Sequence, residues 1–374
     1  MHGATHRTTR VDLRKVPVDG RAKWSTVAII NEPLALDDVA LKTSVSSATR
    51  HPILGFIVRR VATGVLTLWI VSILIFAATN ILPGNVAEVV LGRNATPGRV
   101  HALDVRLGLN HPMVRQYVDW LFGILHGNFG HSLVSVALNQ ASTSVSSTLL
   151  SPLLNSLILA GLTALLLVPL TLLLGALAGV YARRSLDHAI SIPALVLGGL
   201  PEFVTGTLFI YIFFVVFHIL PPVTDLAPGQ SPFTDPKGLV LPVLTLLGVA
   251  LGAGVRQVRA GMSEAMQRDY VQYARLNGIP ERRVRIRYAL RNALAPSVQI
   301  VAQNLQYLLG GIIVVESVFA FPGIGLYLVN AVLARDTVKV EAAAIIIAAA
   351  YTLLNILADL IVVLLVPKLR TAQR

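Results

Sequence analysis

An arginine-rich loop is the first feature of this chain that could do chemistry. Between residues 256 and 291 arginines outnumber acidic residues by nine to three. The arginines are Arg256, Arg259, Arg268, Arg275, Arg282, Arg283, Arg285, Arg287 and Arg291, and the acidic residues are Glu264, Asp269 and Glu281. Such an excess in a short loop between apolar segments is typical of the cytoplasmic side of a membrane. These guanidinium groups can pair with acidic groups of another protein or with anionic lipid heads.

The same loop also carries a pattern beyond its charge. Apolar and aromatic residues recur at Tyr270, Tyr273, Ala274 and Leu276, which predicts a helix that ends at Gly278. The chain then restarts at Ile279-Pro280, and a second helix is expected through Val284, Ile286 and Leu290. A short helix with small residues on one side can enter a groove on another protein. A loop that touches only lipid is the alternative, and charge alone does not separate the two.

A row of uncharged amides follows in the next apolar segment. Gln299, Gln303 and Gln306 have helical spacing that places them on one face, and Asn304 lies beside them. Amides without charge suit the lining of a path through the membrane. Hydrogen bonding between helices, which is common in membrane bundles, is the other interpretation, and both remain open.

Two acidic residues lie in apolar surroundings, Glu202 and Asp359. A charged side chain at the centre of a bilayer costs about 2.5–3.5 kcal/mol on insertion scales, so each should face protein, water or an interface. Asp359 is predicted to bond to a neighbouring helix in a structural role. Glu202 follows Pro201, which can kink its helix, and it is a candidate for the translocation path.

Composition and charge distribution indicate the elements that must position these residues. The 374-residue chain is 54% hydrophobic and only 13% charged, and its charges cluster between long uncharged runs. Since about 20 apolar residues cross a bilayer as a helix, we predict an all-α membrane bundle with six spans. The expected spans are residues 61–83, 153–182, 189–220, 238–258, 294–315 and 342–366.

The placement of Lys and Arg predicts the topology. Both termini and a loop over 262–292 are expected in the cytoplasm, and a folded polar segment over 88–147 is expected outside. Residues 1–51 are expected to form a disordered cytoplasmic extension. The net charge of +12 fits cytoplasmic retention of basic residues better than nucleic-acid binding, and the absence of cysteine excludes disulfides and Cys-ligated metals.

The basic loop then shows a resemblance to a known family. Its residues Asp269, Tyr270, Ala274, Arg275, Gly278, Arg287, Arg291 and Asn292 resemble the cytoplasmic "EAA" loop of ATP-binding-cassette importer permeases, specifically the first-permease type of the dipeptide/oligopeptide systems. The resemblance extends over about residues 52 to 370. It includes Arg59-Arg60, Leu82-Pro83-Gly84, Gly127-Asn128-Phe129-Gly130, Glu316-Ser317-Val318-Phe319, Phe321-Pro322-Gly323-Ile324-Gly325, Asn355 and Asp359. The chain departs from the family at Tyr288, where His is usual, and in its first 50 residues.

The resemblance implies a permease subunit in a bacterial inner membrane, not an enzyme. Its loop would dock as a coupling helix into an ATPase, with Ala274 and Gly278 at the contact. The implied partners are a second homologous permease, two cytoplasmic ATPase subunits that bind ATP and Mg, an extracytoplasmic peptide-binding protein and membrane lipid. Relatives of this type import nickel, glutathione or sugars instead of peptides, and these cargoes remain alternatives.

Two other classes of protein fit the sequence less well. The chain contains no G-x-x-x-x-G-K-[ST] phosphate loop, so hydrolysis of ATP would fall to another chain. A secondary transporter would usually show an internal repeat or ion-coupling charges in the membrane, and would leave the patterned loop unexplained. An intramembrane enzyme would need a motif such as H-E-x-x-H or G-x-S-x-G, and the sequence contains neither.

Overall fold

The computed structural model describes residues 52–81, 91–92, 95–107, 111–137, 144–227 and 229–365. Within these ranges every named element is a helix, so the predicted all-α fold is confirmed. The extension expected over 1–51 and the C-terminal residues from 366 onward lie outside the described residues.

Four of the described helices are long and apolar enough to cross a membrane. They are α1 (Pro52–Ile81), α6 (Val145–Val180), α9 (Pro236–Gln267) and α14 (Thr337–Leu365), and each has 29 to 36 residues. Each exceeds the roughly 20 residues that a span needs. They contain the described parts of the first, fourth and sixth expected spans and all but the last two residues of the second.

The third expected span is broken into two pieces. Helix α7 (Ser185–Gly199) is followed by α8 (Glu202–Ile210) and the π-helical segment η2 (Tyr211–Val216), and the two parts are bent by 112°. The bend falls at Leu200, which has an extended backbone with φ −95° and ψ 140°. A residue before proline is disfavoured in the helical region, and Pro201 follows directly.

The segment 189–220, expected as one span with a kink at Pro201, is therefore broken into two helical pieces. The bend is far larger than the kink expected at Pro201. The fifth expected span, 294–315, lies within α12 (Arg291–Val318), where the side chains of 294–302 lie outside the described part. The count of six spans stays a prediction.

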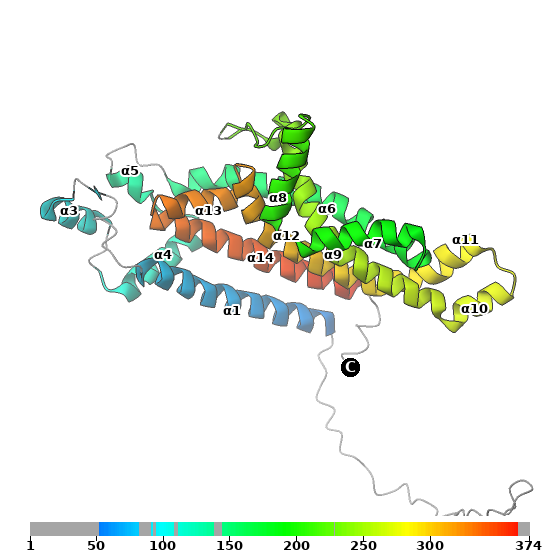
Figure 1. Ribbon diagram of the computed structural model, residues 1–374. Coiled ribbons are helices and arrows are strands. Elements are labelled where there is room, and N and C mark those ends of the chain that lie inside the picture. Colours follow the sequence, from blue (N-terminus) through cyan, green and yellow to red (C-terminus); the bar gives the residue numbers. More distant parts are fainter. Residues whose placement is uncertain are drawn as a thin grey trace, which may run out of the picture. The chain divides into compact units, whose positions relative to one another are not determined.

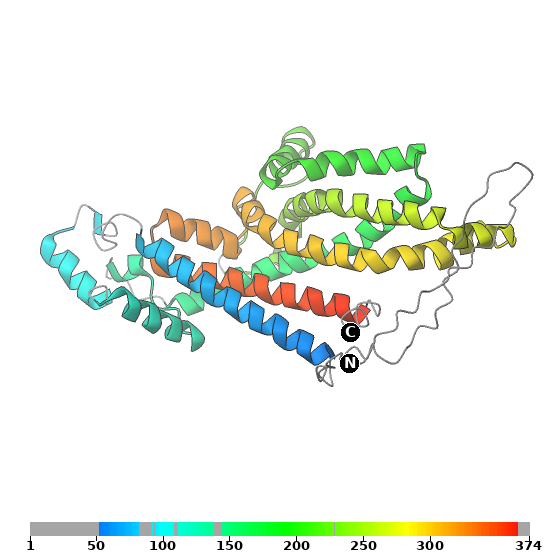
Figure 2. The ribbon, with the colours of Figure 1, turned by 90° about the horizontal axis from the view of Figure 1, so that it is seen from below.

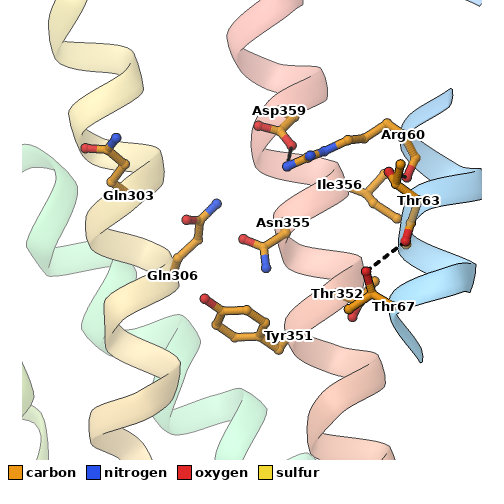
Figure 3. Close-up of a pocket in the computed structure, with 11 residues that line it drawn as sticks. Arg60, Thr63, Thr67, Gln303, Gln306, Tyr351, Thr352, Asn355, Ile356 and Asp359 are labelled. Carbon is orange, nitrogen blue, oxygen red and sulfur yellow. Dashed lines mark hydrogen bonds and ion pairs between the residues drawn. The ribbon is translucent and has the colours of Figure 1, made fainter. Parts of the chain in front are cut away.

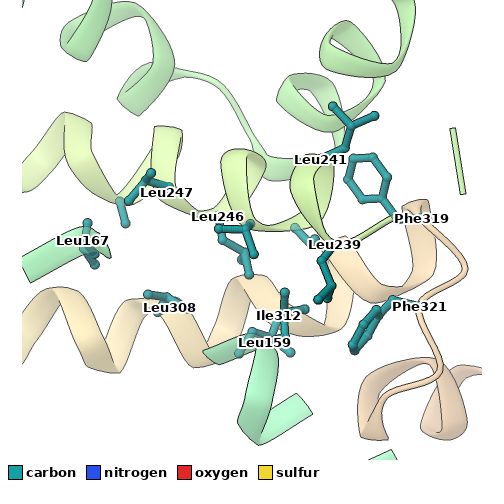
Figure 4. Close-up of a cluster of buried hydrophobic side chains, with 13 residues drawn as sticks. Leu159, Leu167, Leu239, Leu241, Leu246, Leu247, Leu308, Ile312, Phe319 and Phe321 are labelled. Carbon is teal, nitrogen blue, oxygen red and sulfur yellow. The ribbon is translucent and has the colours of Figure 1, made fainter. Parts of the chain in front are cut away.

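Helix α9 is the centre of the bundle. In its most apolar stretch 72% is buried, whereas the corresponding value for α1, α6 and α14 is 11–22%. It packs against α6, α7 and α12. Its leucines join one core cluster with side chains of α6, α12 and the loop after α12 (Figure 4), among them Leu159, Leu167, Leu241, Leu246, Leu308, Ile312, Phe319 and Phe321.

Small residues allow the close helix contacts around α9. A Cβ atom on Gly252 would lie 2.4 Å from the Cα of Gly198 on α7. Gly175 and Gly179 of α6 are equally tight against Val258 and Met262. Apolar side chains gain little by leaving lipid for protein, so such close backbone approach is what holds membrane helices together.

The polar segments gather at the two ends of the bundle (Figures 1 and 2). Three helices of the segment 88–147 lie at one end, and helices α10 and α11 lie at the other. The three are α3 (Pro97–Leu107), α4 (Met113–Leu125) and α5 (Leu133–Ala137). The Tyr117 hydroxyl of α4 lies 2.8 Å from the Ser72 hydroxyl of α1, and Trp120 packs beside Phe76. This segment therefore folds onto the bundle.

Two buried carboxylates organise the same end. Glu316 of α12 accepts hydrogen bonds from the Ser156 hydroxyl and from the backbone N–H of Gly325, 2.7 Å away, at the start of α13 (Ile324–Leu333). Asp336 accepts from the Ser132 hydroxyl, at 2.5 Å, and from the backbone N–H of Leu133. Both carboxylates are fully buried, so they tie the polar end to the helices beneath it.

Candidate functional site

The basic loop folds as two short arms joined by a glycine turn. Helix α9 ends at Gln267, and α10 (Asp269–Leu276) follows after Arg268, whose backbone is extended. Beyond the turn, α11 (Glu281–Arg283) and the π-helical segment η4 (Val284–Leu290) lead directly into α12. The predicted helix, turn and helix are present.

Gly278 makes the turn through its backbone. Its φ of +73° lies in the left-handed region, where a Cβ atom is strained. The N–H of Gly278 donates to the carbonyl of Arg275, and the N–H of Ile279 donates to that of Ala274. This pair of bonds is the Schellman arrangement that ends many helices at glycine.

A small apolar core holds the two arms against the end of α9. Val271 and Ala274 of α10 pack with residues of the second arm and of α9, namely Met262, Ala265, Val284, Ala289 and Ala293. The side chain of Ala274 is only 3% exposed. Ala274 therefore lies inside the loop and not on the face that a partner would meet, which differs from the contact position that the resemblance implied for it.

The outer face of α10 presents large side chains instead. Tyr273 is 71% exposed and Leu276 is 87% exposed, and Tyr270 is also exposed. Asp269 and Arg275 share this exposed surface, with Asp269 in the first turn, where a carboxylate complements the helix dipole. Exposed large side chains grouped at a polar end make this face of α10 a candidate contact surface.

The arginines of the loop have different surroundings. Glu281 begins the second arm, with its carboxylate 2.8 Å from Arg275 Nε of the first arm and 3.3 Å from Arg285 Nε. Arg285 also lies over the Tyr181 ring at the end of α6. Arg287 on the second arm and Arg291 at the start of α12 are exposed. The neighbouring Asn292 is exposed and donates to the carbonyl of Tyr288.

An ion pair that sequence reasoning missed anchors α9 just before the loop. Asp187 of α7 is fully buried and accepts from Arg259 of α9 at 2.5 and 2.6 Å. It also accepts from the Ser191 hydroxyl and from the backbone N–H of Arg183. One signal was present in the sequence, because Asp187 is a lone acidic residue three positions after Arg184.

The candidate path residues separate into two places. Gln303 and Gln306 of α12 line a pocket of about 400 Å³ together with residues of α1 and α14 (Figure 3). Glu202 lies elsewhere, against Gly311 of α12 and near the Tyr307 hydroxyl. The side chain of Gln299 lies outside the described part.

Asp359 joins the pocket through an ion pair. Its carboxylate pairs with the guanidinium of Arg60 on α1, and both groups line the same cavity as the glutamines. The prediction that Asp359 bonds to a neighbouring helix is therefore confirmed. Its partner was not predicted, since Arg60 lies far away in the sequence.

The fold and the basic loop together indicate the class of protein. A helical bundle with several long apolar helices and the basic loop at one end is that of a multi-pass membrane protein. Two family models match the chain. One, described as binding-protein-dependent transport system inner membrane component, covers residues 171–371, and its N-terminal companion covers 53–142. The chain belongs to this family of inner-membrane permeases of ATP-binding-cassette importers.

Curated relatives agree over most of the chain. A putative peptide permease protein of Brucella suis biovar 1 is 32% identical over 85% of this chain and 99% of its own length. A probable peptide ABC transporter permease protein of Sinorhizobium fredii is 31% identical over 84% and 99%. A metal-staphylopine import system permease protein of Staphylococcus aureus is 29% identical over 85% and 99%.

Proposed function

We propose that this chain forms part of the translocation path of an importer for di- and oligopeptides and couples it to separate ATPase subunits. The peptide cargo is supported by the names of the two more similar relatives described above. The coupling role is supported by one observation above all, the exposed Tyr273 and Leu276 on a short helix held rigidly at one end of the bundle.

The physical case for docking rests on how α10 is supported. Eight residues alone are too short for a stable helix in water, because helices below about 12–15 residues are marginal. Packing of Val271 and Ala274 onto the loop core and the Gly278 turn stabilise it instead. A helix so fixed can transmit a rigid-body movement between an ATPase and the bundle.

The proposed assembly follows from this role. A second permease subunit would complete the path, two cytoplasmic ATPase subunits would bind ATP and Mg, and an extracytoplasmic binding protein would deliver the peptide. Membrane lipid would surround the apolar helices. The α10–α11 end would face the cytoplasm with both termini, and the α3–α5 end would face outside.

Import of a metal complex is the second candidate, because the Staphylococcus relative is named for metal-staphylopine import. The described residues hold no group of three or more His, Cys, Asp or Glu side chains that would bind a bare metal ion. A chelated metal would need no such group. Uptake of labelled peptides and of labelled nickel in a strain lacking this chain distinguishes the two cargoes. Loss of peptide uptake alone supports the peptide proposal, and loss of nickel uptake alone overturns it.

Leu276→Asp tests the coupling role. The charge on the exposed tip of α10 should prevent co-purification of the ATPase and reduce ATP-driven uptake to background, with normal amounts of permease in the membrane. Leu333→Asp is the matched control, since Leu333 is 77% exposed in α13, away from the loop. Retention of the ATPase by the Leu276 variant, equal to that of the Leu333 variant, would refute the proposed contact.

A further inference from the structure

The pocket between α1, α12 and α14 contains both a cation and an anion. In Figure 3, Arg60 reaches from α1 to Asp359 on α14, and Gln306 and Asn355 approach each other across the space between α12 and α14. The side chains of Arg60 and Asp359 are 44% and 32% exposed, and the paired oxygen, Asp359 Oδ2, is itself buried by the contact. The pocket's volume of about 400 Å³ is within the range of about 300–1,000 Å³ for small-molecule sites.

The ion pair leaves the pocket without a net charge. A single charge among apolar helices is costly, whereas two opposite charges in contact neutralise each other. A ligand with one negative and one positive end can replace this pair by two new ones. The net charge in the pocket stays at zero before and after the exchange.

We propose that this pocket binds a peptide by its two charged termini. Arg60 receives the α-carboxylate and Asp359 receives the α-ammonium group, once their mutual pair opens. The side-chain amides of Gln303, Gln306 and Asn355 face the peptide unit, whose N–H and C=O they complement. This inference rests on the proposed function, because it assigns a substrate contact within the proposed path.

An anionic lipid head fits the same pocket less well. A phosphate would pair with Arg60 and leave the Asp359 carboxylate without its partner, at the cost of an uncompensated charge. A purely structural pair would explain the contact between α1 and α14, but not the three amides that face the same cavity.

The test measures binding of radiolabelled tri-alanine to the complete permease–ATPase complex, purified in detergent without the binding protein. Tri-alanine amide and N-acetyl-tri-alanine serve as probes that each lack one terminal charge. We expect Arg60→Gln to weaken tri-alanine binding by about tenfold or more, while the affinity for the amide changes by less than about threefold. Asp359→Asn should show the reciprocal pattern, with the acetylated peptide unaffected.

Controls separate this pattern from damage to the fold. Arg59→Gln removes the same charge from an exposed neighbour outside the pocket and should leave all three affinities unchanged. Arg60→Lys keeps the charge and should retain tri-alanine binding, so a variant that simply fails to fold is recognised. An equal loss of affinity for all three probes in the Arg60 and Asp359 variants would show a structural pair and overturn the proposal.

Two further outcomes would overturn the proposed peptide site. No binding of tri-alanine by the wild-type complex overturns the proposed site. Displacement of tri-alanine by phosphatidylglycerol nanodiscs but not by phosphatidylcholine nanodiscs, without any dependence on the peptide termini, assigns the pocket to lipid. Peptide uptake by the wild-type importer is measured in parallel. Its absence refutes the proposed function, whereas normal uptake without the terminal pattern refutes only this inference.

Discussion

Gly278 illustrates how a single backbone conformation shapes the candidate coupling loop. Nothing lies within 4 Å of a Cβ atom built there, so the restriction within this chain is its φ of +73°. Alanine in this region costs about 1–2 kcal/mol, whereas asparagine tolerates it better. Any steric effect of a larger side chain would come from a partner that occupies the open space.

We therefore predict that Gly278→Val abolishes ATP-driven uptake while the protein remains in the membrane. Uptake is measured in cells and permease content by immunoblot of the membranes. Gly278→Asn separates strain in the turn from a steric clash with a partner, since asparagine retains the turn but adds bulk. Loss of uptake in both variants indicates partner contact, and loss in the valine variant alone indicates the turn. Normal uptake with valine would show that the contact has been misplaced.

The Asp187–Arg259 pair is the second residue-scale prediction. Asp187 is fully buried and Arg259 is 33% exposed, so Asp187→Asn leaves a partly buried guanidinium without its carboxylate. We expect a loss of about 2–3 kcal/mol in the free energy of unfolding, less than for a fully buried pair because water screens Arg259. Thermal unfolding of the purified protein measures it. In the double variant with Arg259→Gln part of the loss should be recovered, and an additive loss would contradict the pairing.

At the scale of elements, the contact between α7 and α9 depends on glycine. A Cβ atom on Gly252 would lie 2.5 Å from the carbonyl oxygen of Ala194 as well as against Gly198, and backbone atoms cannot rotate away. Gly252→Ala should therefore separate the two helices and destabilise the protein by about 1–3 kcal/mol.

Gly261→Ala is the matched control for this prediction. Gly261 lies on the same helix with nothing within 4 Å of its Cβ position, and alanine favours the helix by about 1 kcal/mol. It should be neutral or slightly stabilising in the same thermal assay. Equal destabilisation by both substitutions would show that the close approach of α7 and α9 does not matter.

At the scale of the whole molecule, the topology can be tested by thiol labelling. The chain contains no cysteine, so no native residue gives background labelling. Arg115→Cys introduces a thiol on exposed α4, and Leu276→Cys introduces one on exposed α10. A membrane-impermeant maleimide should label the α4 variant in spheroplasts and the α10 variant only in inside-out vesicles prepared without the ATPase subunits. The reverse labelling pattern would invert the proposed orientation.

Much of this organisation was predictable from local patterns. Uncharged runs predicted the helices α1, α6, α9 and α14, because a helix is what satisfies the backbone in lipid. The loop pattern predicted the turn at Gly278, since only glycine adopts the left-handed conformation without strain. The spacing of Gln303 and Gln306 predicted their shared face, which opens into one pocket.

Only the tertiary structure decided which distant groups meet. Asp187 with Arg259, Arg60 with Asp359 and Ser132 with Asp336 are pairs that no spacing along the chain reveals. It also placed Ala274 inside the loop and turned the chain by 112° after α7. Helix formation and the side of the membrane depend on local composition, which a sequence displays. Burial and pairing depend on how the helices pack, and that is a property of the folded chain alone.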